Sequence, residues 1–194
     1  MMDSRFRSQK EDAIGKLNDA VDSGQADEGI LPLLEFINSL EDFYSTSSCS
    51  GRVVLLHDLG RKPENSWLGK WHREVDAGEV LDAMKNTPAG GTVLFKYESA
   101  ILHLVARELE GAKKLLVIAR EAGYKRVGLQ GLKDERYLVE ICDTEKLDVP
   151  VIDKGKVLVD EEYVSYLVSL ANKKFGKGME KLKRLEKNLR DNLR

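Results

Sequence analysis

Hydrophobic positions recur at helical spacing near both ends of the chain and in its middle. Near the N-terminus, apolar residues share one face of a predicted helix that ends at Ser23-Gly24: Phe6, Ala13, Ile14, Leu17, Ala20 and Val21. A second helix is expected over about Asp27–Leu40, with Pro32 in its first turns or at its true start. The same spacing predicts three more helices: Ala77–Lys85, Glu108–Ala122 capped by Gly123, and Glu161 to the C-terminus with a break at Gly176–Gly178.

Apolar runs between the helices predict strands at Arg52–Leu59, Thr92–Glu98, Ile101–Arg107, Arg126–Leu132 and Tyr137–Cys142, with two short runs at Pro150–Ile152 and Val157–Val159. Gly60–Gly69 contains Pro63 and polar residues, which favours an irregular loop. Neighbouring strands without repeated βαβ units indicate an α+β fold. We expect one non-Rossmann domain over residues 1–175, with a mixed or largely antiparallel sheet flanked by helices, and a basic amphipathic helix over residues 176–194.

The runs Thr92–Glu98 and Ile101–Arg107 are predicted to form a hairpin about Ser99-Ala100, which places Lys96 opposite His103. Strand alternation then gives an apolar face with Phe95, Tyr97, Leu102 and Leu104, and a polar face with Lys96, Glu98, His103 and Arg107. The polar face lines a site or is simply the solvated side of a sheet, where charged neighbours pair. Ser-Ala is a weak turn sequence, because neither residue favours positive φ.

Composition narrows the class of protein. The 194 residues are 42% hydrophobic, and no stretch approaches the ~18 apolar residues of a membrane span. The N-terminus lacks the apolar core of a signal peptide, and two cysteines, Cys49 and Cys142, suit a reducing compartment. We therefore expect a cytoplasmic protein that does not bind membranes. A charged fraction of 33% with few Gln and Cys residues is typical of a heat-adapted organism.

Positive charge is concentrated at the C-terminal end. From Asn172 to Arg194 there are nine Lys or Arg against three Asp or Glu, a net charge of +6 in a chain whose total is −2. An apolar stripe runs through the same segment: Met179, Leu182, Leu185, Leu189 and Leu193. The helix is expected to pack on the domain or on a partner chain, and its basic side could also neutralise phosphates. The two interpretations are compatible.

The segment Ser45–Arg52 contains six small hydroxyl or thiol residues, one glycine and one arginine before a buried strand. Backbone N–H groups and hydroxyls in such a loop can converge on an anion or a polar ligand, with Arg52 supplying positive charge. The alternative is a plain turn.

A second candidate is Trp67–His72, where two tryptophans could stack on a nucleobase near His72, or could belong to the core. His57 is interpreted as a core histidine with a satisfied hydrogen bond.

Several common sites are excluded. No CxxC, HxH or HExxH spacing is present, so no metal site is expected. There is also no P-loop, and no Gly-x-Gly-x-x-Gly follows a strand, so a nucleotide-like cofactor would need another architecture. A Cys49–His72 nucleophilic pair remains open, because the sequence does not show whether the two side chains meet.

Taken in chain order, a series of motifs forms a specific pattern: Phe43–Arg52, Lys70-Trp71 with His72, Phe95–Glu98 leading into Ile101–Leu104, Val149-Pro150, Glu161–Tyr163 and Ala171-Asn172. This pattern closely resembles the wybutosine-synthesis protein 3 family in its archaeal type, the tRNA-Phe methyltransferases of the wyosine pathway. The likeness runs from about Arg5 to Lys174. Ser99 departs from it, since the family's proline is expected after the glutamate.

The resemblance implies transfer of a methyl group from S-adenosylmethionine to N4 of a tricyclic wyosine-type base in the anticodon arm of tRNA-Phe. For this reaction we hypothesise three sets of site residues. The catalytic set is His72 or Asp58 as the base, with Ser48 and Cys49 in the polar loop. The cofactor-binding set is Ser47, Gly51, Arg52, Glu98 and His103. The substrate-binding set is Trp67, Lys70, Trp71, Lys96 and Arg107.

These assignments require that the hydroxyl- and thiol-bearing turn, the tryptophan–histidine segment and the polar face of the hairpin form a single cleft. Two rival hypotheses remain: an RNA-binding module without catalysis that presents the base to other enzymes, and a hydrolase that depends on Cys49. Only the methyltransferase requires S-adenosylmethionine. The sequence leaves open the preferred wyosine intermediate and whether the chain forms a weak homo-oligomer.

Overall fold

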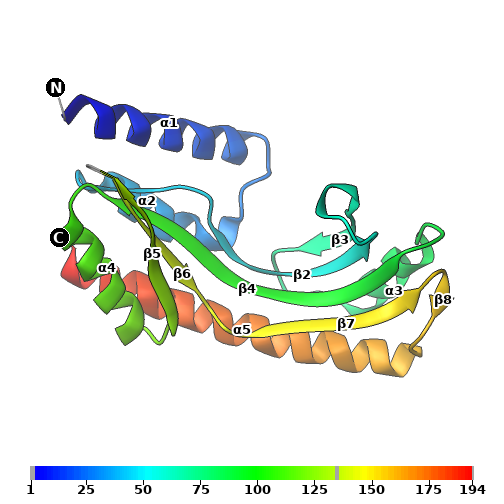
Figure 1. Ribbon diagram of the computed structural model, residues 1–194. Helices are drawn as coiled ribbons and strands as arrows, with labels where there is room; N and C mark the ends of the chain where they lie inside the picture. Colours follow the sequence, from blue (N-terminus) through cyan, green and yellow to red (C-terminus); the bar gives the residue numbers. More distant parts are fainter. Residues whose placement is uncertain (1–2, 134–135, 194) are drawn as a thin grey trace. The chain divides into compact units, whose positions relative to one another are not determined.

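Two compact units make up the computed structural model, which describes residues 3–133 and 136–193. Unit 1 comprises Met1–Ser50, Ala100–Thr144 and Met179–Arg194, and unit 2 comprises Gly51–Ser99 and Glu145–Gly178. Two long elements contribute residues to both units: strand β4 (Thr92–Ala106) and helix α5 (Glu161–Asn192) (Figure 1). Within the described residues, no helix has the length and apolar character that a membrane span needs.

Unit 1 contains an antiparallel sheet in the order β1 (Phe43–Ser45), the C-terminal part of β4, β6 (Arg136–Cys142) and β5 (Arg126–Lys133). Leu104 of β4 pairs with Ser45 on one side and with Val139 on the other. The helices of unit 1 are α1 (Asp3–Asp22), the short η1 (Glu28–Ile30), α2 (Leu31–Ser39), α4 (Leu109–Glu121) and the C-terminal part of α5.

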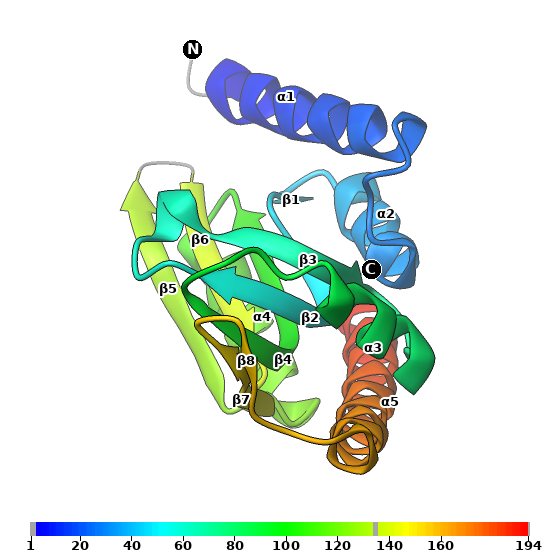
Figure 2. The same cartoon turned by 90° about the vertical axis from the view of Figure 1, so that its right-hand side faces the viewer.

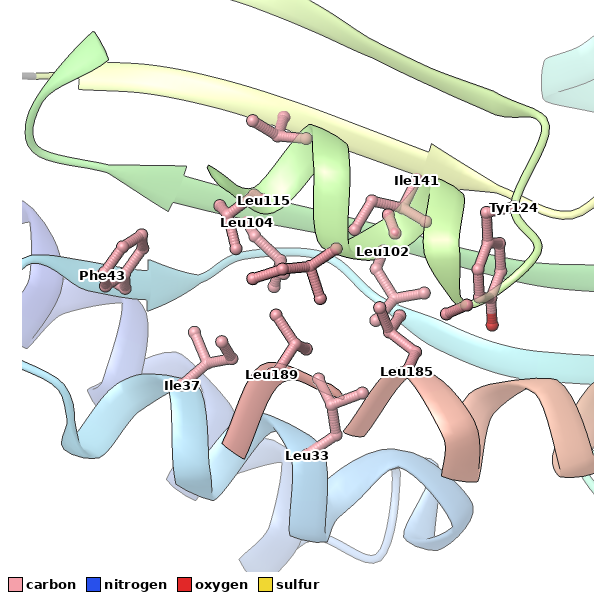
Figure 3. Packing of buried hydrophobic residues seen from close by; sticks show 14 of the residues in the cluster. Leu33, Ile37, Phe43, Leu102, Leu104, Leu115, Tyr124, Ile141, Leu185 and Leu189 are labelled. Carbon is pink, nitrogen blue, oxygen red and sulfur yellow. The ribbon is translucent and has the colours of Figure 1, made fainter. Parts of the chain in front are cut away.

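The larger core of unit 1 lies on one face of this sheet. Leu102 and Leu104 of β4 pack there with residues of α2, α4 and α5, including Leu33, Ile37, Leu115, Leu185 and Leu189 (Figure 3). The predicted apolar stripe of the C-terminal segment is thus confirmed as a packing surface, since Leu182, Leu185 and Leu189 are buried. On the opposite face, Phe6 of α1 packs against Tyr44 and Val105, with the Phe6 and Tyr44 ring centroids 5.2 Å apart.

Unit 2 contains a second antiparallel arrangement, in the order β3 (Ser66–Trp71), β2 (Cys49–Asp58), the N-terminal part of β4, β7 (Lys146–Asp153) and β8 (Lys156–Val157). Its helices are η2 (Lys62–Glu64), α3 (Ala77–Lys85) and the N-terminal part of α5 (Figure 2). The Asn172 side chain of α5 accepts a hydrogen bond from the Val75 N–H (3.0 Å) and donates one to the Val75 carbonyl (2.9 Å). This pair of bonds fixes the segment before α3 against α5.

Most of the predicted elements are confirmed, and so is the α+β class with its antiparallel strands. Helix α3 has the predicted bounds, and α4 ends before Gly123, whose φ of 97° suits only glycine. Pro32 lies in the first turn of α2, so it marks the true start of that helix. The division at residue 175 falls inside α5, and the assignment of residues 1–175 to one domain stays a prediction.

The predicted hairpin about Ser99-Ala100 is wrong. Thr92–Ala106 is one strand that runs straight through these residues, and neither of them has a positive φ. Lys96 pairs with Asp148 of β7, and His103 pairs with Glu140 of β6. The physical reason is the turn chemistry, because Ser-Ala has no preference for the backbone conformation of a tight hairpin.

Two further expectations are corrected. Gly60–Gly69 is not an irregular loop throughout, since strand β3 begins at Ser66 and pairs with β2. Helix α5 continues through Gly176-Lys177-Gly178 without a break. A Cβ atom at Gly178 would lie 2.8 Å from the Tyr97 hydroxyl, so this glycine allows a close contact and does not end the helix.

Candidate functional site

A three-residue turn, Thr46-Ser47-Ser48, joins β1 to β2 in unit 1 and is held by His103 of β4. The Thr46 N–H donates to the His103 carbonyl (2.9 Å), and the His103 N–H donates to the Ser48 hydroxyl (3.2 Å). The His103 ring nitrogen Nδ1 lies 2.8 Å from the Ser47 carbonyl and 3.3 Å from its hydroxyl. Three predicted site residues, Ser47, Ser48 and His103, therefore lie together.

The hydroxyl- and thiol-rich segment is shorter as a loop than predicted. Ser45 belongs to β1, and β2 already begins at the partly buried Cys49. The next residue, Ser50, is fixed by Asp27: its N–H and its hydroxyl donate to the two carboxylate oxygens, at 2.5 and 2.9 Å. Gly51 has a φ of 111°, a conformation that favours glycine at this point of β2.

The other ring nitrogen of His103 faces a carboxylate. Nε2 lies 2.9 Å from Glu140 of β6, whose second oxygen accepts a hydrogen bond from the Gln130 amide of β5 at 2.9 Å. The hydrogen bond with His103 is the main reason why the pKa of Glu140 is lowered. Burial first, and then the negative charge of Glu140, raise the pKa of Cys142 to about 11. The Cys142 thiol is therefore a poor nucleophile near neutral pH.

Arg107, predicted to bind substrate, forms an ion pair with Asp42 at 2.5 Å. It lines a cavity of about 200 Å³ together with Phe6, Arg7, Lys10, Glu11, Ile14 and Glu41. Burial lowers the pKa of Lys10, whose ammonium donates to the carbonyl groups of Leu40 and Glu41. Arg107 thus helps to hold the loop before β1.

In unit 2 a row of charged side chains crosses the sheet on one face. The Arg52 guanidinium of β2 lies over the Trp67 ring of β3, 4.8 Å from its centroid, and contacts Glu98 of β4 through Nη2 at 2.7 Å. Lys96 of β4 lies 3.7 Å from Glu98 and 2.8 Å from Asp148 of β7. The row therefore alternates positive and negative charge, beginning at an exposed indole. Three predicted cofactor or substrate residues, Arg52, Glu98 and Lys96, lie together here with Trp67.

The two tryptophans do not form one stacking platform. A register shift between Leu55 and Leu56 makes Trp67 pair with Leu56 while Trp71 pairs with Val53, so the two indoles lie on opposite faces of the sheet. Lys70 pairs with Val54 and shares the face of Trp67. Trp71 lies directly over Gly69, where a Cβ atom would come within 2.1 Å of the ring.

The two candidate bases, Asp58 and His72, lie at opposite ends of the β2–β3 ladder, because His57 pairs with Ser66 and Val53 with Trp71. An Asp58 oxygen accepts a hydrogen bond from the Gly60 N–H at 2.8 Å, which stabilises the turn after β2. His72 is partly buried and directly follows β3. His57 is buried with its Nε2 2.9 Å from the Gly90 carbonyl, which confirms it as a satisfied core histidine.

Sequence reasoning missed Glu140, Gln130 and Asp148. Glu140 and Asp148 contact predicted site residues, and Gln130 contacts Glu140. Glu140 is the one acidic residue in the apolar run from Tyr137 to Cys142, and a charge in such a run is a detectable anomaly. Gln130 and Asp148 gave no such signal, because their roles depend on strand register. The convergence of the three predicted segments in one cleft stays a prediction.

Known proteins resemble this chain over nearly its whole length. The family model described as Methyltransferase TYW3 matches residues 8–191. A protein of Thermococcus sibiricus named tRNA(Phe) 7-((3-amino-3-carboxypropyl)-4-demethylwyosine(37)-N(4))-methyltransferase is 42% identical over 188 residues, which is 96% of this chain and 95% of that protein. A Pyrococcus furiosus protein with the same name, numbered 1, is 41% identical and covers 95% of this chain and 94% of its own length.

A solved structure of the PH1069 protein from Pyrococcus horikoshii superimposes with a TM-score of 0.90 at 39% identity, covering 98% of this chain and 96% of that chain. A hypothetical protein from Aeropyrum pernix gives a TM-score of 0.73 at 25% identity, over 84% of this chain and 97% of that one. The sequence-based resemblance is thus confirmed from independent comparisons. The chain belongs to the Methyltransferase TYW3 family and is a methyltransferase.

Proposed function

We propose that this chain transfers a methyl group from S-adenosylmethionine to N4 of a 4-demethylwyosine-type base in the anticodon arm of tRNA-Phe. The observation that carries the proposal is the 42% identity, over 96% of the chain, with a relative named for this activity. The substrate would be met in the cytoplasm, in keeping with a composition that includes only two cysteines, neither of which forms a disulfide. A weak homo-oligomer remains compatible with this function.

The donor set of unit 2 fits the methionine end of S-adenosylmethionine, which carries a carboxylate and an ammonium group. Arg52 and Lys96 offer cations, and Glu98 and Asp148 offer anions, in alternation along one face. The exposed Trp67 ring offers an apolar surface beside them. When bound, S-adenosylmethionine supplies the electrophilic methyl carbon on its sulfonium. In this proposal Arg52 binds the carboxylate, and Glu98 with Lys96 orients the polar groups around it.

Methyl transfer to a ring nitrogen requires that the nitrogen be oriented and that its proton be removed. We assign removal of this proton to the His72 imidazole, because the Asp58 carboxylate already accepts a hydrogen bond in the turn after β2. Ser47 and Ser48, in a turn fixed by five contacts with His103, are assigned to hydrogen bonds with the tricyclic base. Cys49 follows them and contributes to the same polar surface.

The decisive test is methylation of tRNA-Phe that carries the 4-demethyl base, with a labelled methyl donor. We expect Ser48→Ala and His72→Ala each to lower the rate at least tenfold, about 1.4 kcal/mol of barrier, with the fold retained by circular dichroism. Ser165→Ala, an exposed serine on the surface of α5, is the matched control and should keep the wild-type rate. Wild-type rates in both site variants would remove the turn and His72 from the mechanism.

Calorimetric titration with S-adenosylmethionine distinguishes this function from a non-catalytic RNA-binding module. Binding at one site per chain, weakened by Arg52→Ala, supports the methyltransferase assignment. Absence of heat at millimolar ligand, with tRNA binding intact, would support the RNA-binding module instead. An activity that needs no methyl donor and is lost in Cys49→Ser would identify a cysteine-dependent hydrolase.

A further inference from the structure

The charged row of unit 2 contains more ion pairs than one ligand needs. Arg52 pairs with Glu98 at 2.7 Å, and Lys96 pairs with Asp148 at 2.8 Å. The α-amino acid end of S-adenosylmethionine carries one carboxylate and one ammonium group, which require one cation and one anion from the protein. The Arg52–Glu98 pair offers both of these partners. The Lys96–Asp148 pair is therefore a second set of the same kind.

This second pair is accessible to a ligand. Lys96 of β4 and Asp148 of β7 lie directly opposite each other in the strand register, and their side chains are 19% and 43% exposed. An ion pair that reaches solvent contributes little to stability, so a charged ligand can exchange contacts with both side chains at little cost. Lys96 also lies 3.7 Å from Glu98, so its ammonium group stands between the two pairs.

The proposed reaction brings together two ligand groups of the same chemistry. The relatives from Thermococcus sibiricus and Pyrococcus furiosus are named for a base with a 3-amino-3-carboxypropyl group at position 7. The methionine end of S-adenosylmethionine is the same group, attached to sulfur in place of a ring. Both groups carry a carboxylate and an ammonium on an alkyl chain of equal length. A site that accepts the methyl donor and such a base together needs two similar subsites.

We propose that Lys96 and Asp148 form a specificity subsite for an α-amino acid side chain on the substrate base. Lys96 binds the carboxylate of that side chain and Asp148 binds its ammonium group, while Arg52 and Glu98 bind the methionine end of the methyl donor. The inference rests on the proposed function and deepens it, because it selects the wyosine intermediate that already carries the amino acid group. A base without the group leaves both protein charges without a ligand partner, so it binds less tightly.

The first experiment measures RNA binding without a methyl donor. Fluorescence anisotropy compares anticodon stem-loops of tRNA-Phe whose 4-demethyl base carries or lacks the amino acid group. We expect the wild type to bind the first RNA about tenfold more tightly, and Asp148→Asn and Lys96→Met to bring this ratio close to one. Asp82→Asn, which removes an exposed carboxylate that pairs with Lys85 at 2.7 Å, is the matched control and should keep the ratio. Equal wild-type affinity for the two RNAs would overturn the proposal.

Chemical modification of the RNA identifies the partner of each charge. Acetylation of the amino group removes its positive charge, and esterification of the carboxylate removes its negative charge. Acetylation should weaken wild-type binding about tenfold and binding by Asp148→Asn far less, and esterification should act in the same way on the wild type and Lys96→Met. Asp148→Glu keeps a carboxylate and should retain the preference. Wild-type binding that neither modification weakens would contradict the subsite, even if a variant fails to fold.

Methylation kinetics provide the third arm. Asp148→Asn should lower kcat/KM about tenfold more for the base with the amino acid group than for the base without it. An equal loss on both bases would assign Asp148 to cofactor binding or to the fold and would refute the subsite. A wild-type chain that distinguishes the two RNAs in binding but transfers no methyl group would refute the proposed function and leave the subsite intact. A chain that methylates both bases equally well would do the reverse.

Discussion

Single side chains decide the geometry around the predicted site residues. Trp71 can lie flat on β3 because residue 69 has no side chain. Arg52 is fixed by a carboxylate and an aromatic face at the same time, through Glu98 and Trp67. Contacts of this kind restrict rotamers, so the polar groups are presented in a defined arrangement before any ligand binds.

Gly69→Ala should displace the Trp71 ring, because the new methyl group would lie 2.1 Å from a ring carbon. We expect a loss of about 1–3 kcal/mol in the free energy of unfolding, measured in urea, and a changed near-ultraviolet circular dichroism spectrum from the indole. Gly128→Ala is the matched strand control, since a Cβ atom there meets nothing within 4 Å. Equal stability of the two variants would show that Trp71 is not fixed over residue 69.

At the scale of elements, α3 begins with a capping box that also organises its neighbours. The Asp76 carboxylate accepts from the Gly78 N–H at 2.7 Å, and Glu79 accepts from the Asp76 N–H at 3.0 Å. Glu79 also forms two hydrogen bonds with Arg73, at 3.0 and 2.6 Å. The hydrogen bond with Arg73 is the main reason that the pKa of Glu79 is lowered to about 2.

This lowered pKa predicts a specific dependence on acid. A carboxyl group with a lower pKa in the folded state stabilises the fold above its unfolded pKa, near 4.5, and loses that contribution as the pH falls toward 2. Glu79→Gln should therefore be less stable than the wild type at pH 7, and the difference should shrink between pH 4.5 and pH 2. Urea unfolding across this pH range measures the difference in stability. Glu35→Gln, at an exposed position of α2, is the control. A constant difference would contradict the assignment.

Elements with strong local signals could be predicted from the sequence, and those set by register could not. Helix α4 has a clear apolar stripe and a glycine at its end, so its limits were predictable. Ser99-Ala100 separates two apolar runs in the sequence, yet both side chains are compatible with the single strand β4. Strand β3 was missed because Pro63 and polar residues precede it, and its pairing with β2 is a long-range property.

At the scale of the whole molecule, the order of several motifs predicted the family, while the partners of the site residues could not be foreseen. The segment around Ser47 was found by its composition, but its attachment to His103 depends on the β1–β4 pairing. Arg52 was selected for its charge, and its ion pair with Glu98 depends on the β2–β4 neighbourhood. Register therefore limits what composition alone can predict about a site.

The uneven charge of the chain leads to a prediction about RNA binding. Along the C-terminal part of α5, Leu185 and Leu189 are buried while Lys183 and Lys187 remain exposed. Under the proposed function these two lysines face phosphates, and each contact contributes about one unit to the salt dependence of binding. Lys183→Ala combined with Lys187→Ala should reduce the slope of log K against log salt concentration by about two units.

The control for this double variant is Lys113→Ala, which removes an exposed lysine of α4 that pairs with Glu110 at 3.1 Å. Fluorescence anisotropy with tRNA-Phe at several salt concentrations provides the slopes. An unchanged slope in the double variant would mean that the helix serves only to pack against unit 1.

The pattern of buried side chains along strand β4 determines which sequence changes the strand can accept. Its inward side chains are Val93, Phe95 and Tyr97 before Glu98-Ser99, but Ala100, Leu102 and Leu104 after them. The alternation thus shifts by one residue at this point, where the partner strand changes from β7 to β6. Substitutions at Ser99 leave that shift intact, whereas deleting a single residue there would turn one set of apolar side chains outward. Related chains can accordingly vary in identity at this position far more readily than in length.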